Sequence, residues 1–269
     1  MLNLVAALSR SPAARRAVQV LRLHRLGNFW LRHFPINKRL PGSQVVYRAT
    51  RLESILLAKE MFETGNLYDA SLLPENFTHF ADLGCNVGYF TVWLAHLARG
   101  RKLCGLMLDA NPEAIREAQW HARANQLSEV FAINGIAGEG QPGGHAEFFL
   151  YESNICSTSQ LTNEMRQNLK GRWNKISVPC IRIGDQWRER FGAARCHLLK
   201  IDIEGSEMNF LRNESAFLAQ VDTILIEWHN WGATLEGIKS FLAGHQFGYV
   251  KTIEESATMG TAFFRRNAG

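Results

Sequence analysis

Two short segments, more than a hundred residues apart, constrain the fold of this chain more than any other feature. Residues 82–91 read DLGCNVGYFT, and residues 200–207 read KIDIEGSE. In each segment an apolar run typical of a buried strand ends in acidic and glycine residues and is followed by a helical pattern. Ligands of open parallel sheets bind where strands end in this way, so both segments predict parts of a binding site.

From residue 79 onward, short apolar runs alternate with helical runs, a pattern that predicts a parallel sheet with helices on both faces. We expect strands at residues 79–83, 102–108, 130–133, 196–201 and 223–227. Helices are expected at residues 88–98, 112–125, 207–218 and 235–243, with Asn111 as the cap of the second. The chain is expected to close with an antiparallel pair of strands at the sheet edge, residues 248–253 and 261–265.

The alternation is interrupted at about residues 146–183, where we predict an insertion. Both of its ends are strand-like and a polar stretch joins them: residues 146–151, 176–183 and 152–175. A polar loop of this length can close over a site. Its hydroxyl side chains are therefore candidates for contact with a cofactor or an acceptor: Ser157, Thr158 and Ser159. A plain surface loop is the simpler expectation.

The positive charge of the chain is confined to its N-terminal end. The formal net charge is +5, yet residues 1–52 contain ten Arg or Lys residues and no acidic residue, which leaves −5 for residues 53–269. We therefore divide the chain into a basic helical arm, residues 1–52, and one α/β domain, residues 53–269. Because the domain is net acidic and no patch outside the arm interleaves aromatic and basic residues, we expect no specific nucleic-acid binding.

Residues 12–34 of the arm are expected to be helical, with arginines on one side, apolar residues on the other, and a break or bend at Gly27. Three interpretations stay open. The helix packs on the domain with its arginines in water; it meets anionic lipid or an acidic substrate; or it belongs to a cleaved organelle-targeting peptide. A secretory signal is disfavoured, because the apolar stretch at residues 1–8 is short and Arg10 follows it.

Composition narrows the class further. Hydrophobic residues make up 46% of the chain, which suits a globular core, and no apolar run reaches the roughly 20 residues that span a bilayer. The five cysteines form no Cys-x-x-Cys pair or Cys/His cluster, so we expect neither a disulfide framework nor a structural zinc site. The expected location is the reducing cytoplasm, with the arm open to peripheral contact at the inner membrane surface.

The first segment has the chemistry of a site for a ligand with an amino acid end and a ribose. Gly84 and Gly88 let the backbone approach a ligand closely, and the helix that starts near Gly88 presents free N–H groups to a carboxylate. Asp109 ends the next expected strand, where a carboxylate accepts hydrogen bonds from both ribose hydroxyls. A dinucleotide fits less well, because the Gly-x-Gly-x-x-Gly spacing is absent.

The two segments resemble the hallmarks of the FkbM family of S-adenosylmethionine-dependent methyltransferases. The matching residues are Asp82-x-Gly84-x-Asn86-x-Gly88-x-x-Thr91 and, more specifically, Lys200-x-Asp202-x-Glu204-Gly205-x-Glu207. In order of elements the resemblance covers about residues 60–265. It implies a Rossmann-like class I methyltransferase fold, with a mostly parallel seven-stranded sheet and an antiparallel edge hairpin at the C-terminus. Many members of the family methylate hydroxyl groups of glycans or secondary metabolites.

S-adenosylmethionine is the cofactor that this resemblance implies. The residues implied to bind it are Asp82, Gly84, Cys85, Asn86, Gly88, Thr91, Asp109 and Ala110. The chain departs from the family pattern at Cys85, where alanine is usual, and at Asp109-Ala110, where Glu-Pro is usual. Residues 183–185 (IGD) are a weak version of the family's Leu-Asp-Asp. These departures bear on the acceptor more than on the cofactor.

Methyl transfer to a hydroxyl requires alignment and a base, because the pKa of an alcohol lies far above 7. Lys200, Asp202 and Glu204 alternate along the expected strand, so they are expected to share a face next to the methyl group. Asp202 is the first candidate for the base or for an acceptor-binding carboxylate. Glu204 is a candidate for holding a substrate hydroxyl or the amino end of the cofactor, and Lys200 for depressing a neighbouring carboxyl pKa or steadying an oxyanion.

A purely structural role is the alternative for these residues, in which Lys200 pairs with Asp202 while Glu204 and Glu207 complement a helix dipole. His229 ends the next expected strand, titrates near neutrality and is the rival base. A divalent cation held by Asp202, Glu204 and His229 is a further option. Nothing in the spacing requires a metal, and none is expected.

The sequence thus predicts O-methylation of a sugar, a glycolipid or a secondary metabolite, with N-methylation of a small molecule as the alternative within the class. From another class, a non-catalytic module that binds the cofactor or a membrane through the arm stays open. The expected partner is a small-molecule or glycan acceptor, and no oligomeric state is predicted.

Overall fold

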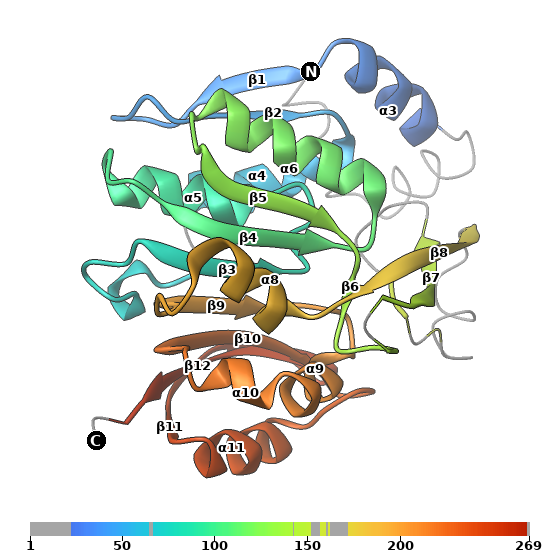
Figure 1. Cartoon of the computed structure of the whole chain (residues 1–269). Coiled ribbons are helices and arrows are strands. Elements are labelled where there is room, and N and C mark those ends of the chain that lie inside the picture. Colours follow the sequence, from blue (N-terminus) through green and yellow to red (C-terminus); the bar gives the residue numbers. More distant parts are fainter. Residues whose placement is uncertain are drawn as a thin grey trace.

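The computed structural model describes residues 23–64, 67–141, 143–151, 157–159, 161 and 172–267. Its centre is a seven-stranded sheet with helices on both faces, as Figure 1 shows. The strand order is β11 (Phe247–Glu255), β12 (Met259–Arg266), β10 (Thr223–His229), β9 (Leu198–Ile201), β3 (His79–Leu83), β4 (Cys104–Asp109) and β5 (Glu129–Asn134). Only β12 runs against its neighbours, and β11 forms the edge beside it. The predicted fold class and the antiparallel edge pair are both confirmed.

The order of connection reverses at the centre of this sheet. The chain proceeds from β3 outward through β4 to β5, and then returns to the other side of β3 to form β9 and β10. Asp82 of β3 and Lys200 of β9 are register partners in a parallel pair. The two sequence motifs therefore end on adjacent central strands, at the switch point where open α/β sheets bind ligands.

Alternate residues of the strands pack against helices on opposite faces. Phe80 lies in a core with α5 (Tyr89–Ala98) and α6 (Pro112–Ala124), while Ala81 lies in a second core. That second core is built with α8 (Ile183–Phe191), α9 (Glu207–Asn213), α10 (Ser215–Leu218) and α11 (Leu235–Gly244). The predicted cap of α6 is confirmed, since the Asn111 side chain accepts the backbone N–H of Glu113 at 2.9 Å.

Two predicted elements on the second face are wrong in their bounds. The strand expected at 176–183 ends at Ile181, because the chain turns at once into α8, a helix the sequence pattern did not predict. The helix expected at 207–218 is two helices, α9 and α10, separated at Glu214. The Glu214 carboxylate accepts the backbone N–H groups of Ile183 and Gly184 at 2.8 and 3.2 Å, so the break positions a cap for α8.

The predicted insertion is a small sheet of β6 (Ile136–Ala137), β8 (Trp173–Ile181) and β7 (His145–Tyr151). β7 pairs antiparallel with β8, which confirms the two expected strands. Most of the loop that joins them, residues 152–156, 160 and 162–171, lies outside the described residues.

The N-terminal segment is helical only in part. α3 (Leu23–His33) continues through Gly27 without a break, and residues 12–22 of the predicted helix lie outside the described residues. β1 (Ile36–Arg39) and β2 (Val46–Ala49) then form a hairpin, so the prediction of a helical arm is wrong for residues 36–49. The reason is local: Pro35 stops the helix, and Pro41-Gly42 makes a turn in which Ser43 N–H donates to Leu40 O.

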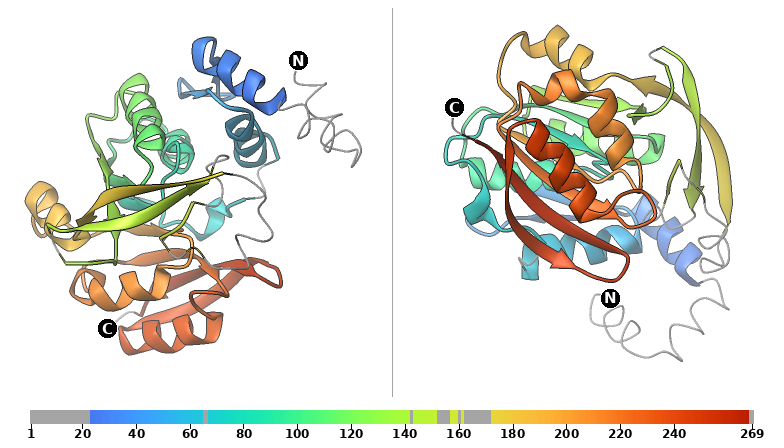
Figure 2. Two further views of the ribbon diagram at one scale, coloured as in Figure 1. Left: turned by 90° about the vertical axis from the view of Figure 1, so that its right-hand side faces the viewer. Right: turned by 90° about the horizontal axis from the view of Figure 1, so that it is seen from below.

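The hairpin is tied to α6 rather than standing apart from the domain. Arg48 Nε lies 2.6 Å from Glu117 Oε1, and the Asn125 side chain pairs with the backbone of Val46. α4 (Leu52–Lys59) and two short helical turns, Glu60–Thr64 and Ala70–Leu72, lead from the hairpin to β3. Figure 2 shows α3 at one end of the molecule and the C-terminal hairpin at the other. No helix within the described ranges is both long enough and apolar enough to cross a bilayer.

Candidate functional site

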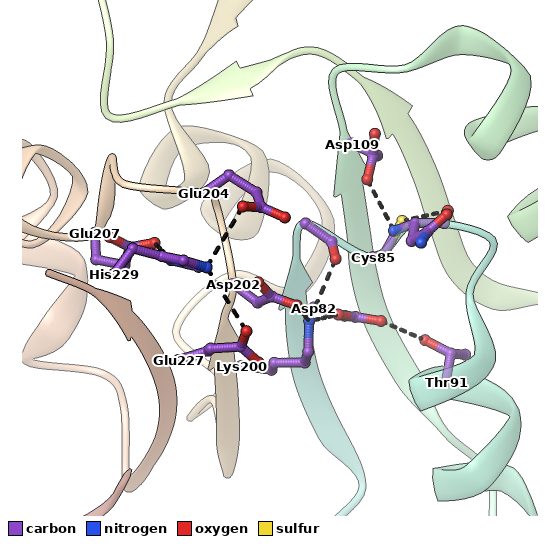
Figure 3. Close-up of polar contacts among 12 residues, drawn as sticks. Asp82, Cys85, Thr91, Asp109, Lys200, Asp202, Glu204, Glu207, Glu227 and His229 are labelled. Atoms are coloured by element: carbon purple, nitrogen blue, oxygen red, sulfur yellow. Dashed lines mark hydrogen bonds and ion pairs between the residues drawn. The ribbon is translucent and has the colours of Figure 1, made fainter. Parts of the chain in front are cut away.

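The site is organised around Lys200, which joins the two motifs. Its Nζ lies 3.5 Å from Asp82 Oδ1 and 3.2 Å from Asp202 Oδ2, and it donates to Gly84 O at 3.2 Å (Figure 3). Burial lowers the pKa of Lys200, but the negative charges beside it, that of Asp202 above all, outweigh this and raise the pKa above its ordinary value. Lys200 is therefore a buried cation that pairs with both carboxylates and offsets one of their two negative charges.

Gly84 is required by the contact between the two motifs. Its φ is +71°, and a Cβ there would lie 1.6 Å from the carbonyl oxygen of Asp202. No other residue could bring the strand ends this close. The close approach expected at Gly84 thus exists, but it is made to the second motif of the same chain.

Asp82 and Thr91 are fully buried at the base of the glycine loop, residues 84–88. Thr91 Oγ1 donates to Asp82 Oδ2 at 3.4 Å, which links the end of β3 to the first turns of α5. The structure therefore places these two predicted cofactor residues where they support the loop and the position of Lys200.

Asp109 is the last residue of β4, and its side chain contacts the glycine loop. Its Oδ2 accepts the N–H of Asn86 and its Oδ1 accepts the N–H of Asn111, both at 2.8 Å. Burial raises the pKa of Asp109 to about 6, and the two backbone hydrogen bonds limit the rise. Each carboxylate oxygen accepts a second hydrogen bond readily, so the pair can still receive two hydroxyl groups of a ligand.

The remaining loop residues shape the backbone. Cys85 is buried, and burial raises the pKa of its thiol well above the ordinary value, so it is an unreactive thiol. Gly88, at φ +84°, is the N-cap of α5. Ala110 packs in a small core with Ile136 and Phe148, between the loop and the insertion.

His229, the last residue of β10, is surrounded by carboxyl groups. Nδ1 of His229 is 3.0 Å from Glu207 Oε1, while its Nε2 is 3.4 Å from Glu204 Oε2 and 3.7 Å from Glu227 Oε1. Burial lowers the pKa of His229, but the Glu207 hydrogen bond and the surrounding negative charges outweigh it and raise the pKa to about 9. His229 is therefore an imidazolium at pH 7, which corrects the expectation that it titrates near neutrality.

The alternation predicted that Glu204 shares a strand face with Lys200 and Asp202, and this prediction is wrong. β9 ends at Ile201, and Glu204 has a φ of +52°, which turns its side chain toward His229 (Figure 3). Burial and the charge of Asp202 raise the pKa of Glu204 well above its ordinary value and that of Glu227 to about 8. Glu227 therefore favours its protonated form at neutral pH, and burial shifts Glu204 in the same direction.

Three residues of this cluster were not predicted as site residues: Glu207 as the partner of His229, Glu227 and Trp231. The indole of Trp231 packs 4.6 Å from the His229 ring and is 39% exposed. A Cβ at Gly205, whose φ is +99°, would lie 2.5 Å from Trp231 Nε1, so this glycine makes room for the indole. Two of the three carry a sequence signal: Glu207 belongs to the second motif, and Glu227 stands two residues before His229 on the same strand face.

The donor set of this cluster also suits a cation once the His229 ring nitrogen and the Glu227 carboxyl have released their protons. Asp202, Glu227 and His229 each offer one ligand atom, and these atoms lie within 4.8 Å of one another. Glu207 holds the other ring nitrogen of His229, which is the usual outer-shell arrangement of a metal-binding histidine. Oxygen and imidazole donors together suit Mg²⁺, Mn²⁺ or Zn²⁺.

The described part of the insertion loop lies against the second motif. Thr158 Oγ1 donates to Glu204 O at 2.8 Å, and Ser159 Oγ lies 2.8 Å from Ser206 Oγ. Ser157 accepts the N–H of Tyr151 at 3.0 Å. The expectation of a plain surface loop is therefore wrong for Thr158 and Ser159, because they bind the turn that carries Glu204.

Comparison with known proteins agrees with this architecture. A family model described as "Methyltransferase FkbM domain" matches residues 82–251, more than half of the chain. No curated protein matches the sequence.

Several solved structures are similar at low sequence identity. One is the methyltransferase FkbM from Methylobacillus flagellatus KT, with 13% identity and a TM-score of 0.47 over 73% of this chain and 46% of that chain. A second is M. capricolum TrmK in complex with S-adenosylhomocysteine, with 11% identity and a TM-score of 0.43 over 74% of this chain and 66% of that chain. A third is M. jannaschii TYW2 in complex with AdoMet, with 14% identity and a TM-score of 0.42 over 87% of this chain and 87% of that chain. The chain thus spans less than half the length of the first and just under two thirds of the second.

Proposed function

This chain belongs to the FkbM methyltransferase family, and we propose that it transfers the methyl group of S-adenosylmethionine to a hydroxyl group of a sugar, a glycolipid or another small molecule. One observation carries the proposal. The glycine loop with Asp109 and the Asp202–His229 cluster lie at the carboxyl ends of neighbouring strands, on either side of the point where the strand order reverses. A cofactor on the first and an acceptor on the second would be side by side.

The first half of the site has the groups that S-adenosylmethionine requires. Asp109 keeps a free lone pair on each oxygen for the two ribose hydroxyls. The first turn of α5 presents backbone N–H groups that suit the methionine carboxylate. When bound, the cofactor supplies an electrophilic methyl group on a positively charged sulfur, and the net negative charge nearby favours that sulfonium.

Methyl transfer to a hydroxyl also requires that its proton be accepted. Asp202 is the carboxylate best placed for this role, because its side chain is 26% exposed and is held by the Lys200 cation. Asp202 would accept the proton that the acceptor hydroxyl loses on methylation. The carboxyl groups of Glu204 and Glu227 would hold neighbouring oxygens of the acceptor.

Trp231 favours a sugar over a smaller alcohol. An exposed indole beside several carboxyl groups matches the two kinds of surface of a sugar ring, whose faces are apolar and whose edge carries hydroxyls. N-methylation remains the alternative within the class, and it would need no strong base at Asp202.

The Asp202, Glu227 and His229 donor set supports a second route for the same reaction, in which a divalent cation lowers the acceptor hydroxyl pKa. The two routes differ in one measurement. Activity that survives dialysis against EDTA supports direct proton transfer to Asp202. Activity that is lost with EDTA, returns with Mn²⁺ or Mg²⁺, and is absent in Glu227→Gln supports the cation.

Titration calorimetry tests the cofactor half of the proposal without an acceptor. We expect micromolar binding of S-adenosylhomocysteine and S-adenosylmethionine, weakened at least tenfold by Asp109→Ala, about 1.4 kcal/mol. Asp185→Ala, at an exposed carboxylate of α8, is the matched control and should bind normally. A panel of sugars with labelled methyl donor then tests the acceptor. Failure of the unchanged protein to bind either ligand would overturn the proposal.

We also propose a cytoplasmic location. Cys85, Cys104, Cys180 and Cys196 are all unpaired, and thiols of this kind persist in a reducing compartment.

A further inference from the structure

The outer face of α3 is the most exposed apolar surface in the described part of the chain. Leu26, Phe29, Trp30 and Phe34, which follows the last residue of the helix, are 59%, 60%, 62% and 66% exposed. Their spacing of three, four and eight residues places them along one side of the helix. We call these four residues the α3 apolar face.

The opposite side of α3 is fixed to the domain, so the apolar face has a defined direction. Asn28 binds Glu53 at 3.2 Å and accepts the backbone N–H of Leu52 at 2.8 Å. Leu31 is buried, and a Cβ at Gly27 would lie 2.9 Å from Leu52 Cδ1. The helix is therefore held with Gly27, Asn28 and Leu31 toward the domain, which leaves its other large apolar side chains in solvent.

The face carries the aromatic composition and the charge of a membrane-interface helix. The Trp30 and Phe34 rings pack 5.3 Å apart, and aromatic residues with a polar edge favour the boundary between lipid and water. Residues 1–39 contain eight Arg or Lys residues and no acidic residue, whereas residues 53–269 carry a formal charge of −5. Basic residues near an anionic lipid surface are attracted to it within about a Debye length.

We propose that the α3 apolar face docks the protein on a lipid bilayer, and the basic, acid-free composition of residues 1–39 favours an anionic one. Burial of two or three aromatic side chains and electrostatic attraction together suit reversible peripheral binding. Figure 1 shows α3 on the side toward which β3, β4 and β5 point, so a docked bilayer lies on the same side as the site. The proposal depends on this surface alone and not on the transferase activity.

Vesicle sedimentation of the full chain tests the proposal. The probes are vesicles of equal parts phosphatidylglycerol and phosphatidylcholine, and vesicles of phosphatidylcholine alone. The variant is Phe29→Ser/Trp30→Ser/Phe34→Ser. Its matched control is Val250→Ser/Met259→Ser, which removes exposed apolar side chains from the edge hairpin instead. Thermal unfolding of each protein confirms that it is folded.

We expect the unchanged chain and the control to bind the anionic vesicles at least tenfold more tightly than the neutral ones, and to be released by 0.5 M NaCl as charges are screened (roughly 4–5 Å Debye length). The triple variant should lose at least tenfold in affinity. Equal binding by the folded triple variant would overturn the proposal, as would no binding by the unchanged chain. If the unchanged chain binds no vesicles but is a dimer that the triple substitution converts to a monomer, the α3 apolar face is instead a contact between two copies of the chain.

Discussion

Nζ of Lys200 lies 3.5 Å from Oδ1 of Asp82, in the interior of the sheet and between two strands whose motifs are more than a hundred residues apart. Among the described residues that oxygen has no hydrogen-bond partner, so the ammonium charge is its main compensation. The pair is completely buried on the Asp82 side and nearly so at Lys200. The ion pair therefore joins the ends of the two motifs, in addition to the parallel pairing of β3 with β9.

Lys200→Met should destabilise the protein strongly, because it leaves Asp82 buried without a cation. We expect a loss of about 3–5 kcal/mol in the free energy of unfolding, measured in urea. The double variant Asp82→Asn/Lys200→Met should recover much of that loss, and Lys175→Met, at an exposed lysine, should change little. If the single Lys200 variant is as stable as the control, the ion pair does not hold the strands in register.

The affinity for S-adenosylhomocysteine should fall as the pH falls through about 6. Burial raises the pKa of Asp109 from 3.8 to about 6, so the folded protein takes up a proton there at a pH where the free side chain would stay ionised. The protonated form accepts ribose hydroxyls less well, and binding is therefore strongest above pH 6. Calorimetry from pH 5 to pH 8 measures the dependence. Asp109→Asn should bind weakly at every pH, and the same slope in that variant would assign the dependence to another group.

His229 should stabilise the protein at low pH and lose this effect as the pH rises. Its folded pKa is raised from 6.5 to about 9, so the contribution is fully present below 6.5 and disappears as the pH passes 9. The displacement corresponds to stabilisation on the order of 3 kcal/mol. Urea unfolding of the unchanged protein and of His229→Gln should thus differ far more at pH 6 than at pH 9.5. His145→Gln, at an exposed position, is the control, and a difference independent of pH would contradict the assignment.

Asp202→Asn should remove methyl transfer to a hydroxyl while leaving cofactor binding intact. Loss of the proton acceptor is expected to lower kcat by about 10²–10⁴-fold, with affinity for S-adenosylhomocysteine unchanged within about threefold. Single-turnover assays with labelled methyl donor measure the first quantity and calorimetry the second. A kcat within tenfold of the unchanged enzyme would favour an amine acceptor, which needs no strong base.

Trp231→Ala should weaken binding of the acceptor more than it slows methyl transfer. Loss of an exposed stacking surface is expected to raise KM for a sugar acceptor about tenfold or more and to change kcat less, since the indole touches no reacting atom in this arrangement. Trp231→Phe should restore most of the affinity. An unchanged KM in Trp231→Ala would remove the indole from the acceptor site.

The sequence by itself determined most of the α/β order and the place of the cofactor loop. Apolar period and turn residues are local properties, so β3 was predicted with its observed bounds, and Asn111 was predicted as the cap of α6. The two motifs could be found for the same reason, since Asp82 and Asp109 stand at the ends of apolar strands and Asp202 directly follows one.

What only the tertiary structure decided depends on contacts between distant segments. Glu207, Glu227 and Trp231 surround His229 because α9, β10 and the loop after it converge, and that convergence makes the imidazole an imidazolium. Glu214 interrupts a helical pattern because it caps α8, some thirty residues away. The outward direction of Phe29 and Trp30 likewise depends on how Asn28 binds α4. A pKa, a helix cap and an exposed face depend on contacts between residues that are distant in the sequence. Local periodicity does not predict those contacts.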